Sequence, residues 1–235
     1  MFSLCYILAG DTAFMVYYFC PRYRDDILRD FVKAITYGLL VSVAGGKLLF
    51  AVTQIPQGRN FWDALLRGGF VFYGGLMGGA VGLAVFCARY RQNFLDWGDI
   101  MCSLLPMCQA IGRIGCFCNG CCYGKPYDGF GSVLYPVNGV KIGVYPTWFM
   151  ESLGCAALFC WLWNRRGRRI RGSVASGYLT GYGILRFCIE FFRGDELRGV
   201  WGLLSTSQII SIIMVLAGVG TGIYAWKYKE QNRLW

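Results

Sequence analysis

The sequence predicts an all-α, polytopic membrane protein with about seven transmembrane helices, its N-terminus outside and its C-terminus in the cytoplasm. The first observation is composition: 56% of the 235 residues are hydrophobic, only 15% are charged, and the mean hydropathy is +0.44. Soluble domains carry about 25% charged residues, so this chain lacks the polar surface to cover itself in water. The second is a series of apolar runs of about 20 residues, the length that crosses a bilayer. The net charge of +10 falls mostly between those runs, which indicates membrane topology rather than nucleic-acid binding.

Each apolar run defines one predicted span. The first run has no basic segment before it and no small-residue cleavage site, so we expect a retained helix rather than a signal peptide. In chain order the predicted spans are approximately Ser3–Cys20, Ala34–Thr53, Gly69–Cys87, Trp97–Cys118, Pro146–Trp163, Val174–Phe192 and Ser207–Trp226.

The distribution of Lys and Arg predicts the orientation. Of the 23 basic residues, 14 fall in the segments after the first, third, fifth and seventh spans, and six fall on the opposite side. Because cytoplasmic loops are enriched in Lys and Arg, the richer side is assigned to the cytoplasm. The chain is then one integral membrane domain, residues 1–235, with an extracytoplasmic cap loop around residues 119–145. That loop contains Pro126 and Pro136 and is rich in Gly and Tyr, so we expect a folded cap.

Ionisable residues within the predicted spans gather in the outer leaflet. Charged groups inside a bilayer are costly and usually mark function. On span six, the spacing i, i+4, i+8, i+11 predicts that four polar residues share one helix face. An internal Arg186–Glu190 salt bridge is the structural interpretation. The functional interpretation is a cationic pocket for an anion such as a phospholipid phosphate, since guanidinium groups bind phosphate bidentately. The residues concerned are Lys47, Arg113, Glu151, Tyr182, Arg186, Glu190 and Arg193.

Span three is rich in glycine, with Gly74, Gly78 and Gly82 four residues apart. This spacing predicts close helix–helix packing. Tyr73 precedes these glycines, where a tyrosine is more often an interfacial residue than a catalytic one.

Four cysteines fall within seven residues at the outer end of span four: Cys116, Cys118, Cys121 and Cys122. Their C-x-C-x-x-C-C spacing lacks a second ligand pair, and the chain has no histidine, so no metal site is expected. A local redox pair is a further interpretation, and packing of small residues around Arg113 is the structural one.

The segment that contains these cysteines resembles the signature of the prolipoprotein diacylglyceryl transferase family, approximately G-R-x-G-N-F-x-N-x-E-x-x-G. Further blocks are similar in the same order: Phe72-Tyr-Gly-Gly-Leu76, Tyr145-Pro-Thr147 with Glu151, Tyr182-Gly-Ile-Leu-Arg-Phe187 and Glu190-Phe-Phe-Arg193. The matching signature residues are Gly112, Arg113, Gly115, Phe117, Asn119 and Gly124. The departures are Cys116 for Asn, Cys121 for Glu and Tyr73 for a family histidine.

The resemblance implies transfer of diacylglycerol from phosphatidylglycerol to the lipobox cysteine of a preprolipoprotein, at the outer face of the bacterial inner (plasma) membrane. It implies no cofactor and no nucleic-acid partner; the partners are phosphatidylglycerol, the lipobox peptide and membrane lipids. Catalytic roles are expected for Arg113, Arg186 and Tyr73, with the arginines also lowering the pKa of the incoming thiol. Substrate-binding roles are expected for Lys47, Gly112, Asn119, Gly124, Glu151, Tyr182, Glu190 and Arg193.

A second function class stays open. A family relative without this activity could bind lipid, or exchange thiols and disulfides through the four cysteines at the outer end of span four. Alkylation of those cysteines would discriminate between the two classes, because only the second depends on them.

Overall fold

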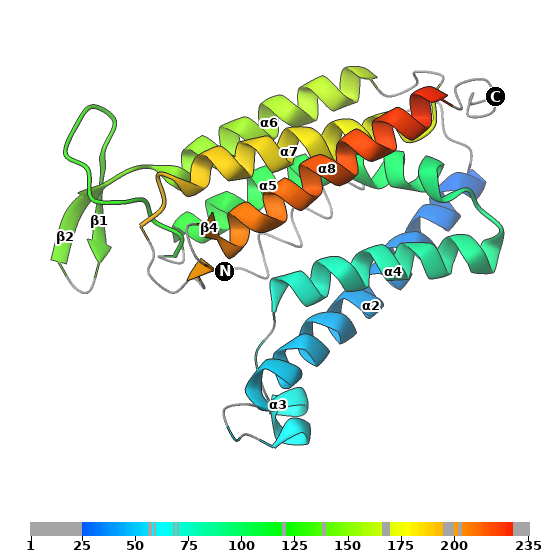
Figure 1. The fold of residues 1–235 in the computed structure, drawn as a ribbon, viewed down its shortest axis with the longest axis horizontal. Coiled ribbons are helices and arrows are strands. Elements are labelled where there is room, and N and C mark those ends of the chain that lie inside the picture. Colours follow the sequence, from blue (N-terminus) through cyan, green and yellow to red (C-terminus); the bar gives the residue numbers. More distant parts are fainter. Residues whose placement is uncertain are drawn as a thin grey trace. The chain divides into compact units, whose positions relative to one another are not determined.

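A computed structural model describes residues 25–55, 58, 60–67, 69, 71–118, 121–137, 140–165, 170–194, 200–201 and 204–227. Helices dominate this part of the chain (Figure 1): α2 (Asp25–Gln54), α3 (Phe61–Arg67), α4 (Phe72–Tyr90), α5 (Phe94–Cys118), α6 (Thr147–Arg165), α7 (Ser173–Glu190) and α8 (Thr206–Lys227). The four short strands are β1 (Val133–Val137), β2 (Val140–Val144), β3 (Val200–Trp201) and β4 (Leu204–Ser205).

The predicted helical class is confirmed, because each predicted span from the second to the seventh coincides with a long helix. The first, Ser3–Cys20, lies outside the described residues. Within the described part, three helical segments are long and apolar enough to cross a membrane: Arg29–Gln54, Phe94–Cys118 and Thr206–Lys227. Large apolar side chains such as Leu40 on α2 and Leu216 on α8 are exposed, as lipid-facing residues would be. The count of seven spans and the orientation stay predictions.

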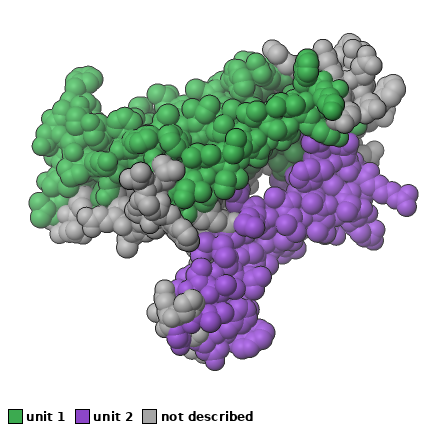
Figure 2. Space-filling model, viewed as in Figure 1, with its two compact units in different colours: residues 1–17, 98–235 green, residues 18–97 purple. Residues whose placement is uncertain are grey.

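The described residues form two compact units (Figure 2). One unit lies within Tyr18–Trp97 and contains α2, α3 and α4. The other contains the described residues of Gly98–Trp235, and therefore most of α5, the hairpin and helices α6 to α8. Each unit has its own internal packing.

Glycines hold α2 and α4 together, as their spacing predicted. A Cβ atom added to Gly74 would overlap the Gly45 carbonyl oxygen, and one added to Gly78 would overlap the Val41 carbonyl oxygen. The two helices therefore touch backbone to backbone along this line. By contrast, a Cβ at Gly79 would meet only the Ser42 Cβ, at 3.9 Å, which is ordinary contact.

The second unit is a helical bundle with a buried core of Cys155, Leu162, Val174, Tyr178 and Tyr182. Asp99 of α5 caps the start of α7: its carboxylate oxygens accept hydrogen bonds from the Gly172 and Ala175 backbone N–H groups at 2.8 and 2.7 Å. Such a cap satisfies helix N–H groups that lack an intrahelical partner.

An antiparallel hairpin lies in the segment between α5 and α6. Strand β1 pairs with β2, with Val133 opposite Val144 and Val137 opposite Val140. The segment before β1 contacts the residues that follow α7. The Lys125 N–H donates a hydrogen bond to the Phe192 carbonyl at 2.8 Å, and Gly124 forms an isolated antiparallel β-bridge with Arg193. The hairpin thus lies at the end of the bundle where α5 and α7 end and α6 and α8 begin (Figure 1).

Candidate active site

Glu151 is the centre of a charged cluster at this end of the bundle. The residue is only 2% exposed. Its Oε1 accepts a hydrogen bond from Arg113 Nη2 of α5 at 2.6 Å and another from the Tyr182 hydroxyl of α7 at 3.3 Å. Its Oε2 lies 3.5 Å from Arg186 Nη1 of α7. One carboxylate of α6 therefore holds two guanidinium groups from two other helices.

Arg186 connects this centre to the start of α8. Its Nη2 donates to Glu190 Oε2 at 2.9 Å and to the Ser207 hydroxyl at 3.3 Å. Its Nη1 is buried and donates no hydrogen bond to any described residue, although it faces Glu151. The Ser205 hydroxyl donates to the other oxygen of Glu190 at 2.9 Å. The Nη1 nitrogen of Arg186 therefore interacts with Glu151 through charge rather than through a hydrogen bond.

The helices place these side chains for simple reasons. Tyr182, Arg186 and Glu190 lie four residues apart on α7, so they share one face, as the spacing predicted. Gly112 and Gly115 flank Arg113 and are buried, and the Ser152 hydroxyl donates to the Ala110 carbonyl at 2.9 Å. That bond ties α6 to α5 within one turn of the Arg113–Glu151 pair.

Two of the four predicted cationic side chains are paired with glutamates in this cluster. Arg113 and Arg186 are matched by Glu151 and Glu190, and the predicted Arg186–Glu190 salt bridge is present. Arg193 is buried and interacts with Cys122, whereas Lys47 belongs to the other unit, where its Nζ lies 3.4 Å from the Leu65 and Leu66 carbonyl oxygens. The cationic pocket stays a prediction.

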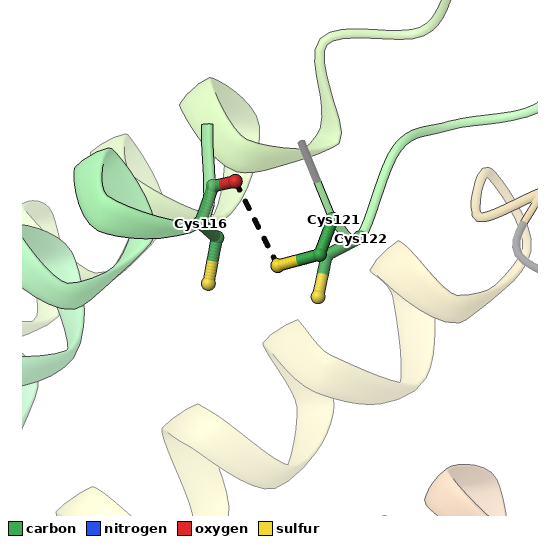
Figure 3. Close-up of side chains that lie close together, drawn as sticks. All are labelled: Cys116, Cys121 and Cys122. Carbon is green, nitrogen blue, oxygen red and sulfur yellow. Dashed lines mark hydrogen bonds between the residues drawn. The ribbon is translucent and has the colours of Figure 1, made fainter. Parts of the chain in front are cut away.

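Three of the four clustered cysteines come together beside Arg113. The sulfur atoms of Cys116, Cys121 and Cys122 all lie within 4.8 Å of one another, and their side chains approach the same space at the end of α5 (Figure 3). Arg113 Nη1 lies 3.7 Å from the Cys116 sulfur. Cys118 is exposed and stands outside this group, which we call the thiol triad.

Neighbouring residues fix the backbone of the thiol triad. The Trp148 indole N–H donates to the Cys121 carbonyl at 2.5 Å, and the Thr147 hydroxyl donates to the Cys122 carbonyl at 2.9 Å. Cys122 adopts a positive φ of 65°, which is unfavourable for a residue with a Cβ and is found mainly where the surrounding structure enforces it. The geometry of this segment is therefore set by α6.

The two thiols in the segment after α5 differ in acidity. A hydrogen bond from the Cys116 thiol lowers the pKa of Cys122 to about 4, helped by the positive charge of Arg193 and Arg113 and opposed by burial. Burial raises the pKa of Cys121 above its ordinary value. The triad thus contains unlike thiols, one of which is readily ionised.

Three further predicted site residues are Gly124, Tyr73 and Asn119. Gly124 is buried, and a Cβ there would overlap the Tyr145 carbonyl oxygen, so the position requires glycine. Tyr73 is the second residue of α4 in the other unit, and its side chain lies outside the described part of the chain. Asn119 also lies outside the described residues.

Sequence reasoning missed several residues that complete the site. Ser205 and Ser207 bind Glu190 and Arg186, and Thr147 and Trp148 hold the thiol triad. The Tyr-Pro-Thr block and the start of the last helix pointed to two of these segments. No sequence signal showed that these side chains contact the arginine cluster or the cysteines, because each contact joins residues 15 to 27 positions apart in the sequence.

Together, the fold and this site define a helical membrane protein with a buried charged cluster at one end of its bundle. Residues 1–224 match the family described as prolipoprotein diacylglyceryl transferase, and the chain belongs to this family. The phosphatidylglycerol–prolipoprotein diacylglyceryl transferase 2 of Clostridium perfringens is 34% identical over 204 residues, which are 84% of this chain and 78% of that protein. The corresponding transferase of Clostridium tetani is 36% identical over 188 residues, covering 77% and 75%. That of Bordetella parapertussis is 34% identical over 217 residues, covering 88% and 81%. The family resemblance inferred from the motifs is confirmed.

Proposed function

We propose that this protein transfers diacylglycerol from phosphatidylglycerol to the lipobox cysteine of a preprolipoprotein, at the outer face of the bacterial inner membrane. Family membership and the printed activities of the relatives support this function. The single structural observation that carries it is the Arg113–Glu151–Arg186 cluster, in which one buried carboxylate fixes two guanidinium groups. The phosphodiester of phosphatidylglycerol is the group that these two guanidinium groups would bind.

In the proposed reaction, the acceptor sulfur attacks the carbon of the diacylglycerol part of phosphatidylglycerol that is bonded to the phosphate oxygen. A carbon–sulfur bond forms, the carbon–oxygen bond to phosphate breaks, and glycerol phosphate leaves with the electron pair. The thiol proton passes to solvent. Negative charge grows on the phosphate as the bond breaks, so fixed cationic donors lower the barrier most when they point at that group.

Arg113 and Arg186 are suited to this role. Glu151 holds both guanidinium groups before substrate arrives, which avoids reorganisation during the reaction. Arg113 retains a side-chain exposure of 20% and Arg186 one of 12%, so part of each side chain is accessible to a substrate. We assign phosphate binding to these two groups, and orientation of Arg186 to Glu190, with Tyr182 supporting Glu151.

We further propose the seven-span arrangement with the N-terminus outside and the C-terminus in the cytoplasm. It is supported by the basic-residue distribution and by the six long helices of the described chain. In this arrangement the charged cluster and the hairpin face the outside, where an exported preprolipoprotein presents its cysteine. Tyr73 is proposed to donate a hydrogen bond to the lipid head group, and Lys47 to attract it electrostatically.

Complementation tests this function. The gene is expressed in a bacterium depleted of its own diacylglyceryl transferase, and lipoprotein modification is read by mass spectrometry of a model lipoprotein. We expect the diacylglyceryl mass on the lipobox cysteine with the wild-type chain and a strong loss with Arg113→Lys. An unmodified lipoprotein beside a normally inserted wild-type chain would contradict the proposed function.

A further inference from the structure

In the proposed function the arginines favour the acceptor thiolate only through their charge, and no side chain is assigned to bind the acceptor sulfur itself. Only the thiolate is a good nucleophile, and an ordinary cysteine is mostly protonated near neutral pH. Histidine is the usual base in that range, and this chain contains none. Arg113, one of the two phosphate-binding arginines, lies beside the sulfurs of the thiol triad instead.

The thiol triad has the composition of a site for a thiophilic cation. Thiolates bind zinc at about 2.3 Å, and two thiolates of a tetrahedral zinc site are therefore roughly 3.8 Å apart. The three sulfurs already lie within 4.8 Å of one another, so small side-chain rotations bring them to binding distance. Among the described residues, no fourth cysteine, aspartate or glutamate joins the three.

The backbone around the triad is organised as a ligand-holding segment. Neighbouring side chains in an extended strand point to opposite sides, whereas the sulfurs of the adjacent Cys121 and Cys122 fall together with Cys116. The positive φ of Cys122 produces this arrangement, and hydrogen bonds from Thr147 and Trp148 maintain it. Zinc sites depend on such hydrogen-bonded support around their ligands.

We propose that Cys116, Cys121 and Cys122 bind one zinc ion as thiolates and that the acceptor cysteine of the preprolipoprotein occupies the fourth tetrahedral position. The inference rests on the proposed function and adds a substrate-activating metal to it. Three protein ligands with one open position are characteristic of catalytic rather than structural zinc sites. The expectation of no metal site relied on the missing second ligand pair and on the absence of histidine, and this arrangement of three thiolates needs neither.

Each step of the proposed activation balances. The triad thiols release their protons when zinc binds, and the acceptor thiol releases one proton to solvent as its sulfur coordinates the ion. The coordinated sulfur then attacks the lipid carbon, the carbon–oxygen bond breaks, and glycerol phosphate departs. The thioether product is a weaker ligand than a thiolate and leaves the zinc. Zinc does not change oxidation state, so no oxidant or reductant is required.

The position of the triad suits this role. Arg113 Nη1 lies 3.7 Å from the Cys116 sulfur, while Arg113 Nη2 belongs to the phosphate-binding pair. An acceptor sulfur on the zinc would therefore lie beside the group that holds the leaving phosphate. Nucleophile and leaving group would be oriented by adjacent residues of one helix end.

Metal binding to the purified full-length protein tests the proposal. After treatment with a chelator, the protein is titrated with Co²⁺ as a spectroscopic probe for zinc, and zinc content is measured by mass spectrometry of the elements. We expect stoichiometric zinc, and sulfur-to-cobalt charge-transfer bands with tetrahedral ligand-field bands. Cys116→Ser, Cys121→Ser and Cys122→Ser should each weaken these bands strongly, whereas the matched control Cys118→Ser, which removes an exposed thiol of the same segment, should keep them.

The acceptor position is tested by adding a lipobox peptide to the cobalt-loaded protein. The cysteine peptide should intensify the charge-transfer bands, and the same peptide with serine in place of cysteine should not. An enzyme that is fully active without metal, cobalt bands that survive all three substitutions, or a disulfide among the triad in native membranes would each overturn the zinc site while leaving the transferase function intact. A protein that binds zinc and peptide but never modifies the peptide would instead contradict the proposed function.

Discussion

At the scale of single residues, the geometry of the site depends on Glu151. Two guanidinium groups and one phenol converge on a carboxylate that is almost fully buried. Burying such a group is favourable only because its oxygens are paired, and removing one member of a buried ion pair typically costs about 3–5 kcal/mol. The cluster is therefore rigid, which is what a phosphate-binding pair requires.

Replacing either arginine of this cluster with lysine distinguishes the effect of its positive charge from the effect of its guanidinium geometry. Arg113→Lys and Arg186→Lys keep one positive charge but lose the planar fork that binds phosphate bidentately. We expect each variant to insert and fold while its kcat/KM falls more than about tenfold, equivalent to about 1.4 kcal/mol of transition-state stabilisation. Activity is measured with phosphatidylglycerol vesicles and a lipobox peptide, with the exposed Arg89→Lys as control. Near-normal activity in both variants would show that the arginines contribute only positive charge and do not bind phosphate bidentately.

Tyr73 offers a second prediction at the residue scale. If its hydroxyl donates a hydrogen bond to the lipid head group, Tyr73→Phe should lose about 1–3 kcal/mol of transition-state binding. A phenolate base would make the loss complete and give the wild type an alkaline pH limb, and an interfacial ring would give no loss. Activity of the two proteins across pH distinguishes the three roles. Tyr73→His provides the comparison with the family residue, and we expect it to be tolerated near neutral pH.

At the scale of elements, α2 and α4 pack through glycines that leave no space for a side chain. A Cβ at Gly78 would overlap the Val41 backbone, which cannot move like a side chain, whereas a Cβ at Gly79 meets only ordinary contacts. The two positions are adjacent on the same helix and therefore form a matched pair.

We expect Gly78→Ala to destabilise the protein by about 1–3 kcal/mol, the usual effect of overpacking. Gly79→Ala should be neutral or slightly stabilising, because alanine is the better helix former. Each variant is heated in detergent, and the fraction that still elutes as a single folded species in size-exclusion chromatography gives its melting temperature. Equal melting temperatures would show that α2 and α4 separate easily.

The hairpin shows what the element-level reasoning missed. The sequence Val-Asn138-Gly139-Val, flanked by β-branched residues, is a strong hairpin signal. The composition of this loop predicted a folded cap but did not predict its two strands. Its strands are only five residues long, far shorter than a membrane span, so they contribute little to a hydropathy pattern.

At the scale of the whole molecule, the proposed orientation makes a direct prediction. Phe130, which is fully exposed beside the hairpin, should react from outside when replaced with cysteine, and Arg168 in the basic segment between α6 and α7 should not. An impermeant maleimide is applied to intact cells, and peptide mapping compares each variant with the wild type because native cysteines also react. The reverse pattern would overturn the orientation and place the charged cluster on the cytoplasmic side.

The sequence predicted elements better than it predicted contacts. Helical lengths, the shared face of α7 and the glycine packing follow from local periodicity, so they could be read from residues such as Tyr182, Arg186 and Gly78. The sharing of Glu151 by two arginines, and the separation of Cys118 from the thiol triad, depend on where α5, α6 and α7 meet. These contacts join residues far apart in the sequence, so no local pattern predicts them.

The Arg113–Glu151 pair also has a consequence for how the protein enters the membrane during synthesis. Its two members belong to consecutive long helices, so α5 or α6 alone would bring an uncompensated charge into lipid, at a cost of several kcal/mol. Released together as a helical pair, the two charges neutralise each other. In α7, by contrast, Arg186 and Glu190 form their own pair one turn apart, and this helix arrives already neutralised. We therefore expect α5 and α6 to leave the translocation channel as one unit, with α7 able to follow singly.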